Sequence, residues 1–155
     1  MHRVRAKHII LAVAVLFFAV QWIPLNRENP PVIQAQTIYA AQYVPATVQS
    51  ILQNSCNDCH SNETRWPWYS HVAPVSWLVV HDVHSGRRHV NFSQWAAYPD
   101  KKKVDRLEQI CDQVTNGDMP DGWYGFVHRS SRLTQEQRES VCEWVESARA
   151  ALPMD

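Results

Sequence analysis

The feature that most restricts what this chain can fold into is the pentapeptide Cys56-Asn57-Asp58-Cys59-His60. Two thiols three positions apart can lie on one helical turn, where each can add to one of the two vinyl groups of a single porphyrin. His60 directly follows the second thiol and is placed to give a ring nitrogen to the iron. The pattern predicts one covalently attached haem c, with Cys56 and Cys59 as attachment thiols and His60 as proximal ligand.

Two other kinds of site share part of this pattern. A zinc knuckle needs a second Cys/His pair at close spacing, and a redox C-x-x-C sits within a βαβ pattern. The remaining cysteines, Cys111 and Cys142, stand alone and far apart, and no βαβ pattern surrounds the motif. Neither alternative therefore has its companion feature.

Composition narrows the class of protein. The 155 residues include 15 Lys plus Arg and 15 Asp plus Glu, so no overall charge favours nucleic acid as a partner. Only four glycines occur and alternating apolar and polar runs are scarce, which favours an all-α domain with long loops. We expect a signal peptide or membrane anchor at 1–25, a linker at 26–43 and a c-type haem-binding domain at 44–155.

The N-terminus indicates the compartment. Basic residues up to Lys7 precede an apolar run over 9–23 that Pro24 stops, a pattern typical of a secretion signal. The run spans roughly 22 Å as a helix, against ~30 Å for a hydrocarbon core, so length does not separate a signal peptide from an anchor. No pair of small residues suited to cleavage follows it, which favours an uncleaved anchor.

Charge then gives the orientation. Positive charge precedes the apolar run and only Arg27 follows closely, so the positive-inside rule places the rest of the chain outside the cytoplasm. Thioether-linked haem is assembled on that side of a bacterial membrane. We expect a single pass through the bacterial inner membrane, with the C-terminal domain in the periplasm.

Apolar periodicity predicts four helices in the domain. The first starts after Pro45 and leads into the haem motif, and the second opens at 73–78 and ends near Gly86. A third carries Val104 to Val114 and is stopped by Asn116-Gly117. The last begins with the capping-box pattern of Thr134 to Gln137.

An aromatic segment follows the haem motif and contains Arg65, Trp66, Trp68 and Tyr69. One interpretation is that the three rings wall the haem while Arg65 or an indole N–H meets a propionate. The other is that the rings form the core of a small domain. A proline carbonyl downstream is suited to accept the second N–H of His60; Pro74 is the first candidate and Pro67 the second.

A second ligand to the iron is expected after the third helix. Met119-Pro120 places a thioether sulfur in a loop that proline stiffens, and sulfur is the soft distal ligand of low-spin electron-transfer haems. The only other methionines, Met1 and Met154, lie at the termini. Met119 is therefore the predicted sixth ligand, and His71 and His128 are its rivals.

Three further patterns are less specific. His81 and His84 share one helix face, which is only half of a metal site, and we expect that face to be solvated together with Arg87, Arg88 and His89. Four glutamates of the last helix share an exposed side (Glu136, Glu139, Glu143, Glu146). Cys111 and Cys142 lie on the last two helices and could pair in an oxidising compartment, but the sequence does not give their separation.

The order of these features resembles a class I cytochrome c domain. The run from Cys56 to Tyr69, then Ala73 to Trp77, Met119-Pro120, Tyr124 and His128, is similar to the bacterial haem-binding-domain family over residues 44–152. This resemblance implies a haem cofactor, with Cys56 and Cys59 at the attachment positions, His60 at the proximal position and Met119 at the Met-Pro position.

Two classes of function follow from these expectations. A His/Met iron with no open site would carry single electrons, so we expect a membrane-tethered periplasmic cytochrome, not an enzyme, that exchanges electrons with a redox partner protein at the membrane. The alternative is a peroxidase-like enzyme or a gas or redox sensor with an open distal side, in which His71 or His128 acts as acid and base.

Overall fold

The computed structural model describes residues 2–153, and all of the regular secondary structure in that range is helical. This confirms the all-α prediction. The longer helices are α1 (His2–Val20), α3 (Ala46–Ser55), α5 (Val75–His89), α6 (Asp100–Asn116) and α8 (Gln135–Ala150). The short ones are η1 (Gln34–Gln36), α2 (Ile38–Ala41), α4 (Asn57–His60), η2 (Trp68–His71), η3 (Phe92–Ala97), α7 (Gly122–Val127) and η4 (Arg129–Ser131).

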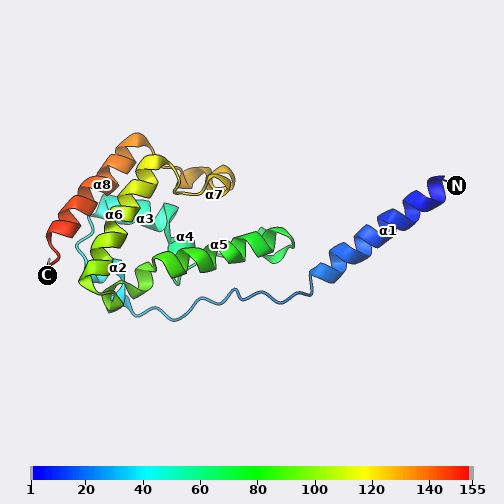
Figure 1. The fold of residues 1–155 in the computed structure, drawn as a ribbon, viewed down its shortest axis with the longest axis horizontal. Coiled ribbons are helices and arrows are strands. Elements are labelled where there is room, and N and C mark those ends of the chain that lie inside the picture. The colour runs from blue at the N-terminus through cyan, green and yellow to red at the C-terminus, as the bar shows by residue number, and fades with distance from the viewer. Residues whose placement is uncertain (1, 154–155) are drawn as a thin grey trace.

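The core lies among α3, α6 and α8. Helices α6 and α8 pack along one another, while α3 lies against α8 and leads to α4 near the centre of the molecule (Figure 1). Helix α5 leaves this bundle from α4 and extends to one side. The buried apolar cluster consists of Ile38, Val48, Ile51, Leu52, Val90, Phe92, Trp95, Leu107, Val114, Leu133, Val141, Trp144, Val145 and Ala148.

Local signals in the sequence explain where these helices begin and end. Helix α3 starts directly after Pro45, as predicted. Helix α6 ends at Asn116 because Gly117 takes φ +80°, a left-handed conformation that glycine adopts without steric cost. The capping box of α8 is formed: Gln137 N donates to Thr134 Oγ1 (3.2 Å) and Thr134 N to Gln137 Oε1 (2.9 Å).

The folded domain begins earlier than the expected boundary at residue 44. Residues 34–41 form η1 and α2, and Ile38 of α2 is fully buried in the core. The Gln42 side chain donates to the Ala148 carbonyl (3.2 Å). The second half of the expected linker is thus part of the domain. Its apolar residue Ile38 belongs to the core, although the sequence around it shows no helical periodicity.

Helix α5 also differs from its prediction. It continues past Gly86 to His89, and Arg87 is not a solvated residue. The Arg87 guanidinium donates to the Ser61 carbonyl (2.7 Å), the Glu28 carbonyl (3.0 Å), Asn29 Oδ1 (2.6 Å) and Thr64 Oγ1 (2.8 Å). Arg87 therefore joins α5 to the loop after the haem motif and to the segment that follows α1.

Helix α1 points away from the other helices (Figure 1). Just after it, the Gln21 side chain pairs with the backbone of Ala73, accepting from its N–H (2.8 Å) and donating to its carbonyl (3.4 Å). Apolar side chains from Ile9 to Phe18 are largely exposed on α1. Within residues 2–153, no helix combines the length and the hydropathy that a membrane span requires.

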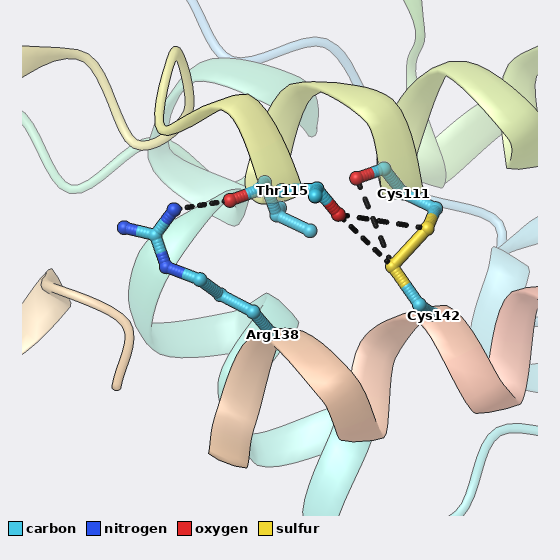
Figure 2. The surroundings of a disulfide bond; sticks show 5 residues. Cys111, Thr115, Arg138 and Cys142 are labelled. Carbon is cyan, nitrogen blue, oxygen red and sulfur yellow. Dashed lines mark hydrogen bonds between the residues drawn. A yellow bond between two sulfur atoms is a disulfide. The ribbon is translucent and has the colours of Figure 1, made fainter. Parts of the chain in front are cut away.

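A disulfide joins the two helices that dominate the core. Cys111 of α6 and Cys142 of α8 form a disulfide bond, and their Cα atoms are 4.9 Å apart (Figure 2). The sequence alone had left open whether these two cysteines pair. Thr115 Oγ1 lies 3.4 Å from Cys142 Sγ. One turn of α8 earlier, the Arg138 guanidinium donates to the Val114 carbonyl near the end of α6. The two helices are thus joined covalently and by hydrogen bonds.

Loss of this disulfide should destabilise the domain. The bond closes a loop with a sequence separation of 31, which corresponds to about 3 to 4 kcal/mol of lost chain entropy in the unfolded state. We expect Cys111→Ala/Cys142→Ala to lower the free energy of unfolding by up to about that amount in denaturant titrations followed by circular dichroism. The control is Ser147→Ala on the exposed side of α8. Equal midpoints for the double variant and the control would contradict the prediction.

Candidate functional site

The pentapeptide lies at a break between two helices. Helix α3 ends at Ser55, Cys56 follows with φ −125° and ψ −35°, and the single turn of α4 contains Cys59 and His60. The N–H groups of Cys59 and His60 both donate to the Cys56 carbonyl, at 3.2 and 2.9 Å. This turn brings the two cysteines to one side of the backbone. Both are free thiols and half-buried.

The surroundings keep both thiols protonated. Burial raises the pKa of Cys56 to about 12, with a smaller contribution from Cys59. Burial also raises the pKa of Cys59 to about 12, followed by the carboxylates of Asp58, Asp82 and Asp121. The raised pKa values keep both groups in the S–H form at neutral pH, whereas the thiolate is the form that attacks disulfides and oxidants.

Two backbone carbonyls of α5 and its C-cap orient the His60 ring. Its Nδ1 lies 3.1 Å from the Gly86 oxygen and 3.2 Å from the Val90 oxygen. Since both partners are acceptors, Nδ1 carries the proton and Nε2 keeps its lone pair. Burial lowers the pKa of His60, which also favours the neutral ring. Within residues 2–153, Nε2 makes no hydrogen bond.

The predicted acceptors for His60 were therefore wrong. Pro74 is the N-cap of α5, whereas the His60 ring contacts the opposite end of that helix. Pro67, the second candidate, accepts instead from the Ser70 N–H (2.9 Å) and hydroxyl (2.6 Å). The Gly86 carbonyl also accepts the Val90 N–H (2.9 Å), and Val90 is the C-cap of the helix, so both acceptors for His60 come from the C-terminal end of α5 and not from a proline.

Gly86 also permits the close packing of α5 against the motif. A Cβ at this position would lie 2.6 Å from the Cys59 carbonyl oxygen and 3.2 Å from the Cys59 Cβ. No side chain fits in that space without moving the backbone of one helix. Gly86 is thus a site residue that sequence reasoning missed, and its only signal was a glycine inside a helical pattern.

Asp58, between the two cysteines, is the centre of a second set of contacts. Arg65 donates to it through its backbone N–H (3.0 Å), Nε (3.1 Å) and a terminal nitrogen (3.1 Å), and the Tyr124 hydroxyl donates at 2.7 Å. Burial alone would raise the pKa of Asp58, but these hydrogen bonds lower it. Arg65, predicted to meet a propionate, is paired with Asp58 in this structure.

The three aromatic residues that were predicted to wall the haem, Trp66, Trp68 and Tyr69, lie in different surroundings. The Tyr69 hydroxyl lies 2.6 Å from His128 Nε2, and the Trp68 side chain is 78% exposed. Trp66 Nε1 is buried and has no hydrogen-bond partner in the described part of the chain. None of the three rings belongs to the apolar core cluster, so the interpretation of these rings as core does not hold.

Met119, the predicted sixth ligand, is 36% exposed and lies between α6 and α7. Asp121, two residues later, adds to the effect of burial in raising the pKa of both Cys59 and Asp82. The start of α7 therefore lies within electrostatic range of the Cys59 thiol and of α5. His71 is also exposed, and His128 is engaged by Tyr69.

Apolar side chains are exposed on α5, which packs against α4, and on α7, whose Tyr124 donates to Asp58 of α4. Leu78 and Val75 lie two and three turns before Gly86 on α5, and both are exposed. On α7, Trp123 and Phe126 are exposed and, with Asp121 and Gly122, line an open hollow. Two protonated thiols and, beside them, an imidazole with a free Nε2 form a donor set that fits a haem.

A family model described as "Haem-binding domain" matches residues 15–147. The chain belongs to the haem-binding-domain family. Family membership assigns haem binding to this chain, and the match covers the pentapeptide, α5 and the Met119 loop. Neither a curated protein nor a solved structure gives a significant match.

Substitution of Gly86 should disturb the haem-binding motif specifically. In Gly86→Ala the new methyl group meets the Cys59 carbonyl, and overpacking of this kind costs about 1 to 3 kcal/mol, which exceeds the ~1 kcal/mol that alanine gains in a helix. We expect a lower unfolding free energy and less haem bound per chain, measured by denaturation and by pyridine haemochrome.

Gly122→Ala is the matched control, because a Cβ there meets nothing within 4 Å. It should leave stability and haem content unchanged or slightly improved. If Gly86→Ala behaves like Gly122→Ala, the close contact between α5 and Cys59 does not limit the site.

Proposed function

We propose that this haem-binding domain carries one haem c and transfers single electrons as a membrane-tethered periplasmic cytochrome. The observation that carries the proposal is the joint geometry of the motif: two free thiols one turn apart, and beside them an imidazole whose Nδ1 is committed to two carbonyls. A non-covalent haem pocket needs no thiol pair at this spacing, whereas thioether attachment does.

The chain's own groups suit each task of such a carrier. Cys56 and Cys59, protonated at neutral pH, provide the S–H groups that form thioethers. His60 offers Nε2 as a ligand, and the carbonyls of Gly86 and Val90 increase the electron density on the ring through Nδ1–H. When bound, the haem iron supplies a one-electron couple.

Met119 is the proposed sixth ligand. Its sulfur is partly exposed in a loop next to α7, whereas His128 already has Tyr69 as a partner for Nε2. A ligand on both sides of the iron leaves no open position for substrate, which favours an electron carrier over a peroxidase-like enzyme or gas sensor. A thioether ligand also raises the reduction potential relative to a second histidine.

Two features support a location outside the cytoplasm. The disulfide between Cys111 and Cys142 is of a kind that persists in oxidising compartments. Helix α1 opens with basic residues and then exposes apolar side chains from Ile9 to Phe18, and this order of charge and apolar surface is what supports the proposed tether, although the helix does not meet the length and hydropathy of a membrane span. The proposed redox partner is accordingly a protein at the same bacterial inner membrane.

Covalent attachment can be tested directly. Protein produced in a host competent in haem c maturation should keep its pigment in acidified organic solvent, because thioether bonds survive unfolding. Cys56→Ser/Cys59→Ser should lose the pigment to the solvent, whereas Cys111→Ser/Cys142→Ser should retain it. Release of the pigment from the wild-type chain would contradict thioether attachment and, with it, the proposed c-type cytochrome.

Met119→Ala should open the iron. We expect loss of the weak far-red absorption band that sulfur ligation gives to ferric haem, rapid binding of carbon monoxide by the ferrous protein, and a reduction potential lower by about 0.1 V, within the ~0.8 V range that axial ligands span. His71→Ala, at an exposed side chain, serves as the control and should retain the band. Rapid carbon monoxide binding by the wild-type protein would show that the distal side is already open.

A further inference from the structure

The Asp58 carboxylate connects the haem motif to the Met119 region. It lies between the two attachment cysteines and its side chain is only 12% exposed. The Arg65 guanidinium donates to both carboxylate oxygens at 3.1 Å, and the Tyr124 hydroxyl donates to Oδ2 at 2.7 Å. Tyr124 is 66 positions further along the chain, so this bond is a long-range tie between α4 and α7.

The short segment from Met119 to Tyr124 has little freedom at either end. At its start, the N–H groups of Asp118 and Met119 both donate to the Gln113 carbonyl of α6, at 3.0 and 3.1 Å. At its end, Asp121 caps α7 by accepting from the N–H of Trp123 (2.9 Å) and of Tyr124 (3.4 Å). Met119 is thus held between the end of α6 and the start of α7, and Tyr124 belongs to the second of these two supports.

The Tyr124 ring is itself fixed. It stacks on His128, with ring centroids 4.5 Å apart and planes inclined by 24°. His128 Nε2 in turn lies 2.6 Å from the Tyr69 hydroxyl. The stacking on His128 and the hydrogen bond to Asp58 thus both hold the Tyr124 ring.

We propose that the hydrogen bond from Tyr124 to Asp58, the Tyr124–Asp58 clasp, positions the Met119 sulfur toward the His60 side of the haem motif. Tyr124 is thus a positioning residue that contacts neither the iron nor a substrate. This inference rests on the proposed His60 and Met119 ligation. Asp58 is the second of the two variable residues in the motif. The clasp gives it a structural role that the C-x-x-C-H pattern alone does not require.

The test is a titration of ferric protein with imidazole, which competes with Met119 for the iron. In Tyr124→Phe the ring and its stacking remain, but the hydroxyl is lost. A hydrogen bond to a charged group corresponds to about ten- to hundredfold in an equilibrium constant, so the apparent dissociation constant for imidazole should fall at least about tenfold. Tyr43→Phe, which removes a hydroxyl from a highly exposed side chain, is the control and should match the wild type.

A second pair of variants covers the case in which Tyr124→Phe does not accumulate. Arg65→Ala leaves the Tyr124 bond in place, whereas Asp58→Ala removes it. Only Asp58→Ala should strengthen imidazole binding about tenfold. Where Tyr124→Phe does accumulate, the Tyr124→Phe/Asp58→Ala double variant should change the apparent dissociation constant for imidazole no more than the more effective single variant does. Both substitutions remove the same hydrogen bond, so their effects should not add.

The outcomes separate this inference from the function on which it rests. Suppose that the wild type shows the far-red band and that Tyr124→Phe changes the apparent dissociation constant for imidazole by less than twofold. This result would overturn the clasp and leave Met119 as ligand. Additive shifts in the double variant would overturn the clasp in the same way. Absence of the band from the wild type would overturn Met119 ligation, and the clasp with it.

Discussion

The contact between the haem motif and the C-terminal end of α5 is the constraint on which the rest of the site depends. Gly86 lets its helix approach the Cys59 backbone closely, and its carbonyl, with that of Val90, fixes the His60 ring. Two residues after Val90, Phe92 enters the apolar core, and its ring lies 6.0 Å from the His60 ring. The His60 side of the motif is thus joined directly to the most buried part of the domain. An imidazole held in this way keeps its tautomer and orientation without any charged partner, because backbone carbonyls cannot titrate.

Signals carried by a few neighbouring residues were sufficient to predict one boundary of each of three helices, α3, α6 and α8. Pro45, Gly117 and the Thr134 capping box each act within one turn, and each marks the boundary that the structure has. Predictions that depended on distant contacts were less successful. Ile38 has no periodic apolar neighbours, yet it is buried because α2 packs against η3. Arg87 reads as one member of a basic cluster, but the carbonyls that it binds come from segments 26 and 59 positions away.

The same distinction applies to the candidate site. The spacing of Cys56, Cys59 and His60 encodes their chemistry locally, and the structure keeps all three in one turn with free thiols. The partners of these residues are encoded elsewhere. Pro74 was a reasonable acceptor from sequence, but the direction in which α5 crosses the motif decides which carbonyl His60 meets, and no local pattern gives that direction. Asp58 looked like a variable position between two cysteines, and only the fold brings Tyr124 to it.

The two sides of the proposed iron site depend on different parts of the fold. The His60 side is joined to α5 and, through Val90 and Phe92, to the core. The Met119 side begins at the Gln113 carbonyl near the end of α6, where Arg138 of α8 also binds the adjacent Val114 carbonyl. Because the disulfide joins these same two helices, it stabilises the support of Met119 more directly than that of His60. Local opening at the α6 and α8 ends would therefore loosen the support of Met119 before that of His60, since helix ends open at lower free energy than the core.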